Sequence, residues 1–368
     1  MKLIALKDVC KINMGQSPNS SNYNDYGDGM PFFQGNADFG ERYPITRVWC
    51  NTPTKIAQAE DILISVRAPI GALNYAKEEC CIGRGLAAIT PDRNKVSQDF
   101  IYWALKGKKA ELNDKGNGST FKAISRKILE QTMIPDINFE QQHKCAENLE
   151  KIYGIIQNRR KELLALDDLI KARFVEMFGD PVSNPKGWDM VELGELTGIG
   201  SSKRIFEKEY VSEGIPFYRT KEIVELSKGN SISTELYITE ERFAEIKEQY
   251  GVPKAGDLLI SAVGTIGIIW IVDGKNDFYF KDGNLIRVDS SDKFDSVYMK
   301  NLLENLIVEY KKQMSSGTAY AALTISGLTK MKVYDVPMEL QNQFADFVRQ
   351  VDKSKLMFQK LHQKLNIL

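Results

Sequence analysis

The side chains that most often carry catalysis are few and scattered in this sequence. The two histidines, His143 and His362, fall in segments with helical patterning, away from any candidate nucleophile. No pair of cysteines has zinc-site spacing. The glycine-containing stretches Gly264–Gly267 and Gly198–Lys203 are too short or wrongly spaced for a P-loop or a dinucleotide fingerprint. These residues therefore predict a chain without a catalytic centre of its own.

Two aspartates remain as possible catalytic groups. Asp61 and Asp257 each precede a short apolar run that is typical of a strand. A carboxylate at the start of a strand also commonly accepts hydrogen bonds from nearby backbone N–H groups. We favour this backbone-binding role over a catalytic one.

Composition limits the class of protein. The chain has 368 residues, of which 43% are hydrophobic and 27% charged, so it is long enough for two or more domains with cores of their own. Its apolar runs fall short of the ~20 residues needed to span a bilayer, and Met1–Ile12 lacks a signal-peptide core. Five cysteines, two of them vicinal, predict reduced thiols and a cytoplasmic location. A net charge of zero disfavours a free-standing nucleic-acid binder but allows local basic patches.

One stretch, Glu140 to Phe178, predicts a single helix of roughly 58 Å, which is too long for an ordinary core helix. Asn138 and Gln141 form a capping-box pattern before it, and Gly179 and Pro181 follow it. Its apolar residues follow a heptad pattern in which Arg159 and Arg173 fill two gaps. They are Leu149, Ile152, Ile156, Leu163, Leu166, Ile170 and Met177.

The same pattern returns at the C-terminus, with a polar position at Ser354. It comprises Phe344, Phe347, Val351, Ser354, Phe358, Leu361, Leu365 and Leu368. Because neither narrow stripe can be buried alone, we expect the two helices to pack on each other and to leave surface for a partner helix. The alternative is a long helix lying on a larger globular core.

The segments before each helix resemble each other at an offset of about 185 to 202 residues. Met30–Phe33 corresponds to Ile215–Tyr218, Ala59–Ser65 corresponds to Ala255–Ser261, and Ile124-Ser125 is matched to Ile325-Ser326. The pattern predicts an α+β fold with an internal pseudo-twofold repeat, in which two similar strand-rich domains are separated by two long antiparallel coiled-coil helices. The expected segments are 1–138, 139–180, 181–337 and 338–368.

The chain resembles the specificity (S) subunit of a type I restriction-modification system. The resemblance covers the whole sequence in the family's order. It is carried by Leu166–Pro181, Asn184–Trp188 with Val191–Leu196, Asp61–Arg67 and Leu340–Lys355. The second helix ends about 28 residues after Gln341 and is shorter than the first, so the distal part of its docking surface is expected to be reduced.

The resemblance implies two target-recognition domains that read the two halves of an asymmetric double-stranded DNA site. It also implies that the helices set the spacing and dock two methyltransferase (M) subunits, and that restriction/translocase (R) subunits join the complex. Catalysis would belong to those partners, with S-adenosylmethionine, ATP and Mg. No cofactor and no metal is expected in this chain, and no association with a membrane is expected. The nearest string to an adenine methyltransferase motif, Asn184–Gly187, lacks its second proline and its aromatic residue.

If the domains read DNA, amide and cationic side chains beside strand ends are the candidate contacts, because they donate to base edges and phosphates. Each could instead be an ordinary solvated residue. The Gly-Ser-Thr turn at 118–120 and the Ser-Gly-Thr turn at 316–318 could bind phosphate, although capping a helix is the favoured role. The candidates are Gln34, Asn36, Arg67 and Arg84 in the first domain, and Ser202, Lys203, Arg204, Arg219, Lys221, Lys281 and Asn284 in the second.

Partner docking is expected on the helices, and two other functions remain open. The docking residues would be Leu149, Ile152, Ile156, Leu163, Leu166, Ile170, Phe347, Val351, Phe358 and Leu361. One alternative is a coiled-coil adaptor whose two domains bind proteins rather than DNA. The other is an enzyme with an unrecognised site. An adaptor would show no salt-dependent DNA binding, whereas a DNA-reading protein would. Modification of DNA by the purified chain alone would indicate an enzyme.

Overall fold

A computed structural model describes residues 2–117, 122–314 and 322–365, with side chains to residue 312 in the second range and 356 in the third. The chain divides into two compact units, Met1–Gln157 (unit 1) and Asn158–Leu368 (unit 2). The candidate turns at 118–120 and 316–318 lie outside the described residues. No helix in the described ranges combines the length and the apolar character that crossing a membrane requires.

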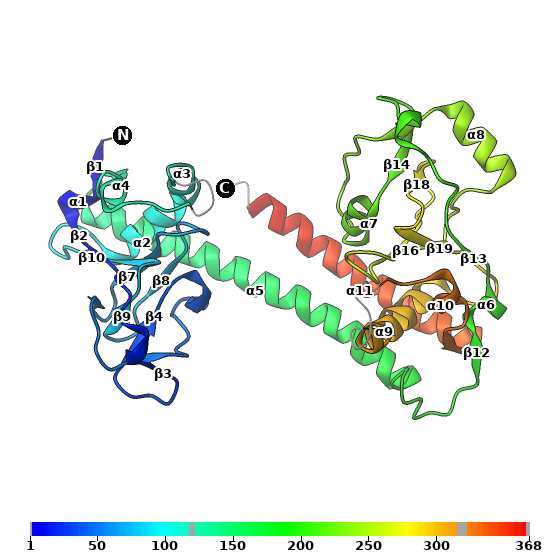
Figure 1. Ribbon diagram of the computed structural model, residues 1–368, viewed down its shortest axis with the longest axis horizontal. Coiled ribbons are helices and arrows are strands. Elements are labelled where there is room, and N and C mark those ends of the chain that lie inside the picture. Colours follow the sequence, from blue (N-terminus) through cyan, green and yellow to red (C-terminus); the bar gives the residue numbers. More distant parts are fainter. Residues whose placement is uncertain (1, 118–121, 315–321, 366–368) are drawn as a thin grey trace. The chain divides into compact units, whose positions relative to one another are not determined.

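Unit 1 contains two main sheets (Figure 1). One has four antiparallel strands in the order β2 (Cys10–Met14), β10 (Leu86–Pro91), β7 (Ile62–Ser65) and β8 (Leu73–Tyr75). The other has the order β3 (Tyr23–Asn24), β5 (Trp49–Cys50), β4 (Met30–Phe33), β9 (Cys80–Ile82) and β6 (Ile56–Ala57). Within it, β4 and β9 run parallel.

Every residue of β7 is buried, because the sheet has helices on one side and the second sheet on the other. Its helices are α1 (Leu6–Val9), α2 (Gln98–Gly107), α3 (Lys109–Asp114) and α4 (Arg126–Glu130). Helices α2 and α3 are separated at Lys108, whose ψ of 3° departs from helical geometry.

Unit 2 repeats this plan. Its four-stranded sheet has the order β13 (Ile199–Gly200), β19 (Leu285–Val288), β16 (Leu258–Ser261) and β17 (Ile269–Ile271). Its smaller sheet has the order β15 (Tyr237–Ile238), β14 (Ile215–Tyr218) and β18 (Tyr279–Phe280), with β14 and β18 parallel. The helices are α6 (Leu193–Leu196), α7 (Thr220–Ser227), α8 (Glu240–Gln249), α9 (Ser296–Met314) and α10 (Ile325–Thr329).

A two-stranded ribbon completes each copy and gives the register of the repeat. Strand β1 (Leu3–Ala5) pairs with β11 (Met133–Pro135), and β12 (Met190–Glu192) pairs with β20 (Lys332–Tyr334). In one copy the Ile124 N–H donates to the Val66 carbonyl, and in the other the Leu323 N–H donates to that of Ala262. Ile124 therefore corresponds to Leu323, and the predicted match to Ile325 was wrong by two residues. The ladder is made by backbone groups, so a recurring Ile-Ser pair does not fix its register.

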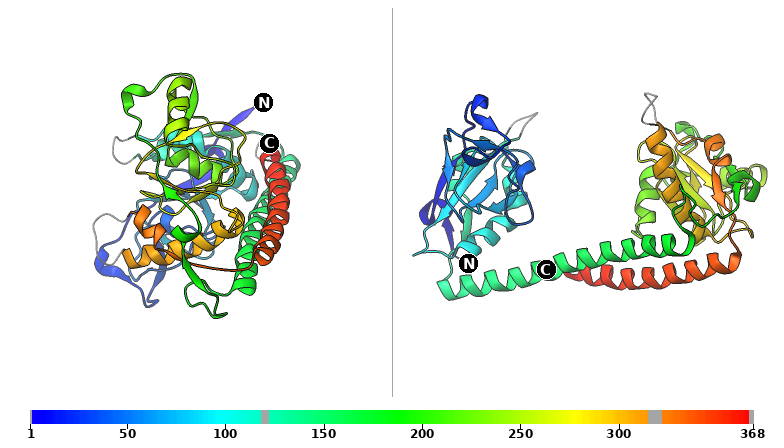
Figure 2. Two further views of the ribbon diagram at one scale, coloured as in Figure 1. Left: turned by 90° about the vertical axis from the view of Figure 1, so that its right-hand side faces the viewer. Right: turned by 90° about the horizontal axis from the view of Figure 1, so that it is seen from below.

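Both long helices begin where the sequence predicts, and the first of them also ends there. Helix α5 (Phe139–Phe178) starts with a capping box, in which the Gln141 N–H donates to the Asn138 side chain at 2.9 Å. It ends at Gly179, whose φ of +83° is a left-handed conformation that favours glycine. Helix α11 (Met338–Leu365) lies beside the C-terminal part of α5 within unit 2 (Figure 2).

Candidate nucleic-acid interface

The candidate residues of unit 1 gather at the carboxyl ends of the parallel strands β4 and β9. Gln34 directly follows β4, and Arg84 lies two residues after β9. Gln34, Asn36 and Arg67 line one open hollow of about 530 Å³. Its floor and walls include Phe32, Val48 and Pro69. The hollow therefore combines apolar surface with side chains that can donate hydrogen bonds.

Gly85 holds the two sides of this hollow together. Its N–H donates to the Gln34 carbonyl at 3.1 Å, and its own carbonyl accepts from the Val66 N–H at 2.9 Å. A Cβ atom at Gly85 would lie 2.2 Å from the Gln34 carbonyl oxygen. Glycine is thus required for the backbone of Gln34 to approach the segment that carries Arg67.

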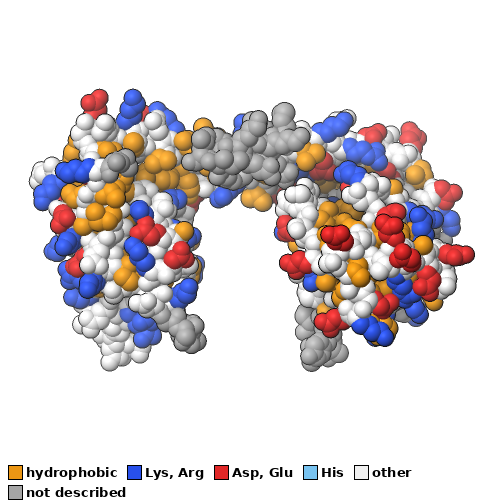
Figure 3. All heavy atoms as spheres, turned by 90° about the horizontal axis from the view of Figure 1, so that it is seen from above, with side chains coloured by type: hydrophobic (Ala, Val, Ile, Leu, Met, Phe, Trp, Pro, Cys, Tyr) orange, Lys and Arg blue, Asp and Glu red, His pale blue; other side chains and the backbone are white. Residues whose placement is uncertain are grey.

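The cations of this edge face solvent. Arg67 and Arg84 are both exposed, and among the described residues neither guanidinium lies within 4.0 Å of a carboxylate. Burial raises the pKa of the Tyr23 hydroxyl, and the Arg84 charge acts on it in the opposite direction. The Asp38 carboxylate also lines this hollow, and it accepts from the backbone N–H groups of Gln34 and Gly35 at 2.7 and 3.2 Å. Figure 3 shows basic, acidic and apolar side chains interspersed on one face of each unit.

The seven candidates of unit 2 gather at the equivalent place, around the ends of β14 and β18. The Lys281 N–H donates to the Tyr218 carbonyl at 2.9 Å, as the Gly83 N–H does to that of Phe33. Arg219 and Lys221 follow β14, and Asn284 closes the loop after β18. The segment Ser201–Arg204 lies against this loop, because the Gly283 N–H donates to the Ser201 hydroxyl at 3.4 Å.

Carboxylates hold most of the unit 2 cations, in contrast to unit 1. Arg219 donates to Glu222 at 3.1 Å, and Glu222 is only 2% exposed. Lys221 lies 3.5 Å from Glu222 and 3.8 Å from Glu235. Arg204 Nε donates to Asp282 at 2.7 Å, while the Lys281 ammonium lies 3.6 Å from the same carboxylate. The Lys203 ammonium lies 5.1 Å from the Tyr250 ring centre.

Sequence reasoning missed the acidic partners. Glu222 had a detectable signal, because it stands three residues after Arg219 and its carboxylate accepts from the Arg219 N–H at 2.8 Å in a cap of α7. Asp282 had no such signal, since the loop that brings it to Arg204 is distant in sequence. Ser202 is half-buried and its hydroxyl has no hydrogen-bond partner among the described residues.

The two aspartates that could suggest catalysis are structural. Asp61 accepts from the Gln58 N–H at 2.9 Å, and Asp257 accepts from the Lys254 N–H at 2.8 Å. Both are buried at the same place in their repeats. The favoured backbone-binding role is confirmed. The described residues contain no cluster of three His, Cys, Asp or Glu side chains able to hold a metal ion.

The second candidate surface is the helix pair of unit 2, which is antiparallel. Phe344 near the start of α11 contacts Phe178 at the end of α5, with ring centres 5.6 Å apart. Further along, the Lys355 ammonium lies 2.6 Å from the Asp167 carboxylate. Ile170 of α5 and Val351 of α11 are buried in one hydrophobic cluster, and Leu166 and Phe347 pack against the same cluster. The expected packing of the two stripes is confirmed for these residues.

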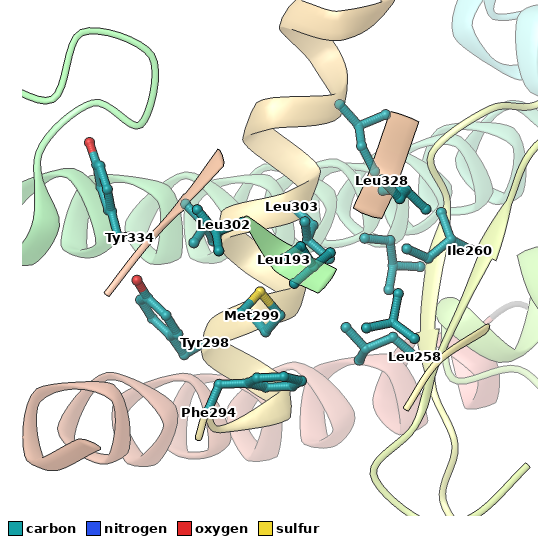
Figure 4. Packing of buried hydrophobic residues seen from close by; sticks show 14 of the residues in the cluster. Leu193, Leu258, Ile260, Phe294, Tyr298, Met299, Leu302, Leu303, Leu328 and Tyr334 are labelled. Carbon is teal, nitrogen blue, oxygen red and sulfur yellow. The ribbon is translucent and has the colours of Figure 1, made fainter. Parts of the chain in front are cut away.

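The core of the pair includes residues that the heptad pattern left out. Phe174 and Phe178 are 1% and 0% exposed and contact Tyr298 of α9. Figure 4 shows Tyr298 and Met299 of α9 within this cluster. The C-terminal end of α5 and the start of α11 thus lie on a globular core as well as on each other, so the two alternatives from the sequence both hold in part.

Four of the remaining docking candidates lie outside this core. Leu149 is 41% exposed, and Ile152, Ile156 and Leu163 are half-buried. Phe358 and Leu361 fall where the structure describes no side chains. The N-terminal part of α5 is instead fixed to unit 1 by Arg42, which pairs with Glu150 and lies 5.4 Å from the Tyr153 ring centre.

Comparison with known proteins links this arrangement to one family. The model of the type I restriction modification DNA specificity domain matches residues 1–165 and again residues 185–367. The crystal structure of the type I restriction-modification system S subunit from M. genitalium matches with a TM-score of 0.59 at 17% identity. That match covers 100% of this chain and 93% of the other. It shows a shared fold with two repeats.

Curated relatives carry the same description. The MjaX protein of Methanocaldococcus jannaschii, assigned as a type I restriction enzyme specificity subunit, is 47% identical over 41% of this chain and 36% of its own length. The MjaIX specificity subunit of that organism is 27% identical over 64% of this chain and 60% of its own. The EcoBI specificity subunit of Escherichia coli is 21% identical over 73% and 61%. The chain thus matches less than two thirds of the length of each of these relatives.

Proposed function

Because the chain belongs to the type I restriction modification DNA specificity domain family, we propose that it reads an asymmetric, bipartite site in double-stranded DNA. The observation that carries this proposal is the pair of equivalent edges at the ends of β4 and β9 and of β14 and β18. The two edges have the same backbone position but different side chains. Different side chains at equivalent positions support two half-sites of different sequence.

In this proposal residues 1–138 and 181–337 are the two target-recognition domains. Residues 139–180 and 338–368 are the helices that set the distance between half-sites and dock two methyltransferase subunits. One helix, α5, contains residues of both units, which supports its role as the spacer. The exposed Leu149 and the half-buried Ile152 and Ile156 offer apolar surface for docking.

The chain would act without catalysis of its own. Adenine-N6 methylation with S-adenosylmethionine would belong to the methyltransferase subunits, and ATP- and Mg-dependent cleavage to the restriction/translocase subunits. The five free thiols, four of them buried, support a reducing compartment such as the cytoplasm.

Binding to random-sequence duplex DNA tests this function. The full chain should bind DNA with an affinity that falls steeply with salt, and should enrich a two-part motif from a randomised library. Binding that is absent both alone and with a co-expressed methyltransferase subunit would favour the adaptor function. Cleavage or methylation of DNA by the purified chain would contradict the assignment of catalysis to partners.

A further inference from the structure

Arg204 differs from the other cations at the edge of unit 2. Its side chain is 66% exposed, whereas that of Arg219 is 32% exposed and is held against the buried Glu222. Lys221 is 53% exposed but lies between two carboxylates. Arg204 is therefore the cation of this edge that combines broad exposure with a single, close carboxylate partner.

Asp282 fixes the direction in which Arg204 points. Its side chain is 11% exposed, and it accepts from Arg204 Nε at 2.7 Å. A guanidinium has five N–H donors in one plane, so a bond at Nε leaves both terminal nitrogens free to donate side by side. The contact thus presents a planar, outward-facing pair of donors.

The backbone around Arg204 is fixed as well. The Lys203 N–H donates to the Tyr279 hydroxyl at 2.6 Å, and Ile205 is 1% exposed in the unit 2 core. The Ser201 hydroxyl accepts from the Gly283 N–H, in the loop after β18, at 3.4 Å. An arginine held at its backbone and at Nε loses little conformational freedom on binding, which favours a directional contact.

We propose that Arg204 reads a guanine in the half-site bound by unit 2, and that Asp282 is the residue that positions it. A planar donor pair matches the O6 and N7 acceptors that guanine presents in the major groove. A phosphate contact would need charge but no fixed plane. Unit 1 lacks this arrangement, since Arg67 and Arg84 have no carboxylate partner among the described residues, and its amides Gln34 and Asn36 match adenine instead. This inference rests on the proposed DNA-reading function.

Selection from a randomised duplex library with the full chain tests the assignment. Arg204→Ala should lower the preference for guanine at one position of one half-site by roughly tenfold, and leave the other half-site unchanged. Arg204→Lys should restore charge but only part of the preference. Asp282→Asn should keep Arg204 and lower the same preference several-fold. Lys228→Ala, which removes a cation of similar exposure paired with Glu225, is the matched control and should change neither half-site.

Two results would overturn the assignment while leaving DNA reading intact. One is a bipartite motif that is identical for the wild-type chain and for Arg204→Ala. The other is a uniform loss of affinity for all sequences with a shallower salt dependence, which would make Arg204 a phosphate contact. A wild-type chain that enriches no sequence would overturn the proposed function together with this inference.

Discussion

Gln142 in α5 and Gln341 in α11 form the same two hydrogen bonds in the two copies of the repeat. The Ser97 N–H donates to the Gln142 side-chain oxygen at 2.7 Å, and the Gln142 amide donates to the Ile137 carbonyl at 2.8 Å. In unit 2 the Asp295 N–H donates to Gln341 at 3.0 Å, and Gln341 donates to Val336 at 2.8 Å. Each long helix is thereby tied at its start to the domain that precedes it.

Replacing Gln341 by Ala should therefore destabilise unit 2. The change leaves a buried N–H and a buried carbonyl without partners, which costs about 1–3 kcal/mol of unfolding free energy. Chemical denaturation of the full chain measures this cost. Gln343→Ala, at an exposed position two residues away, is the control and should have no measurable effect. Equal stability of both variants would show that the glutamine bonds do not hold the helix start.

Gly85→Ala should impair the edge of unit 1. The added methyl would lie 2.2 Å from the Gln34 carbonyl oxygen, so the strand end must shift. Overpacking of this kind costs about 1–3 kcal/mol, and selection from a randomised library should show a weakened preference in one half-site. Gly107→Ala, where nothing lies within 4 Å of the new methyl, is the control. An unchanged motif and unchanged stability would show that Gly85 does not shape the site.

The buried thiols should resist alkylation in the folded chain. They should also make the folded chain less stable at high pH. Burial raises the pKa of Cys10 and of Cys80 to about 12, from an unfolded value near 9. Because only the unfolded chain ionises these thiols between pH 9 and 12, stability should fall as the pH rises through that range. Iodoacetamide at pH 8, followed by mass spectrometry, should label the exposed Cys145 first. Rapid labelling of Cys80 in the native chain would contradict the buried position.

Shortening both long helices should change the gap between half-sites. Removing four residues from α5 and four from α11 shortens each helix by ~6 Å, which corresponds to roughly two base pairs at ~3.4 Å each. The selected motif should keep both half-sites and lose about two base pairs of its gap. Changed half-sites with an unchanged gap would mean that the helices do not set the spacing.

Much of the fold could be predicted because it depends on local signals. Each correct prediction rests on a few consecutive residues. These are the capping box at Asn138, the left-handed Gly179 and the match of Met30–Phe33 to Ile215–Tyr218. The predicted register at Ile124 was wrong because the register depends on backbone hydrogen bonds between segments that are distant in sequence. Phe174 and Phe178 were missed because α5 contacts α9 as well as α11, which a two-helix heptad pattern does not consider.

The candidate site was predictable in position but not in chemistry. All the candidates lie beside strand ends, as the alternation of apolar and polar segments indicated. Whether a cation is free or paired depends on loops that meet only in the folded chain. Asp282 reaches Arg204 across 78 positions of sequence, so no local pattern could distinguish Arg204 from Arg67.

Sequencing of methylated adenines tests whether this chain reads a two-part DNA site. The chain is expressed with the methyltransferase subunit proposed to dock on it, in a cell that lacks other adenine methylation, and the modified sites are read from single DNA molecules. We expect one asymmetric motif of two different half-sites with a fixed gap. Methylation at a single uninterrupted motif, or without any sequence preference, would contradict this expectation.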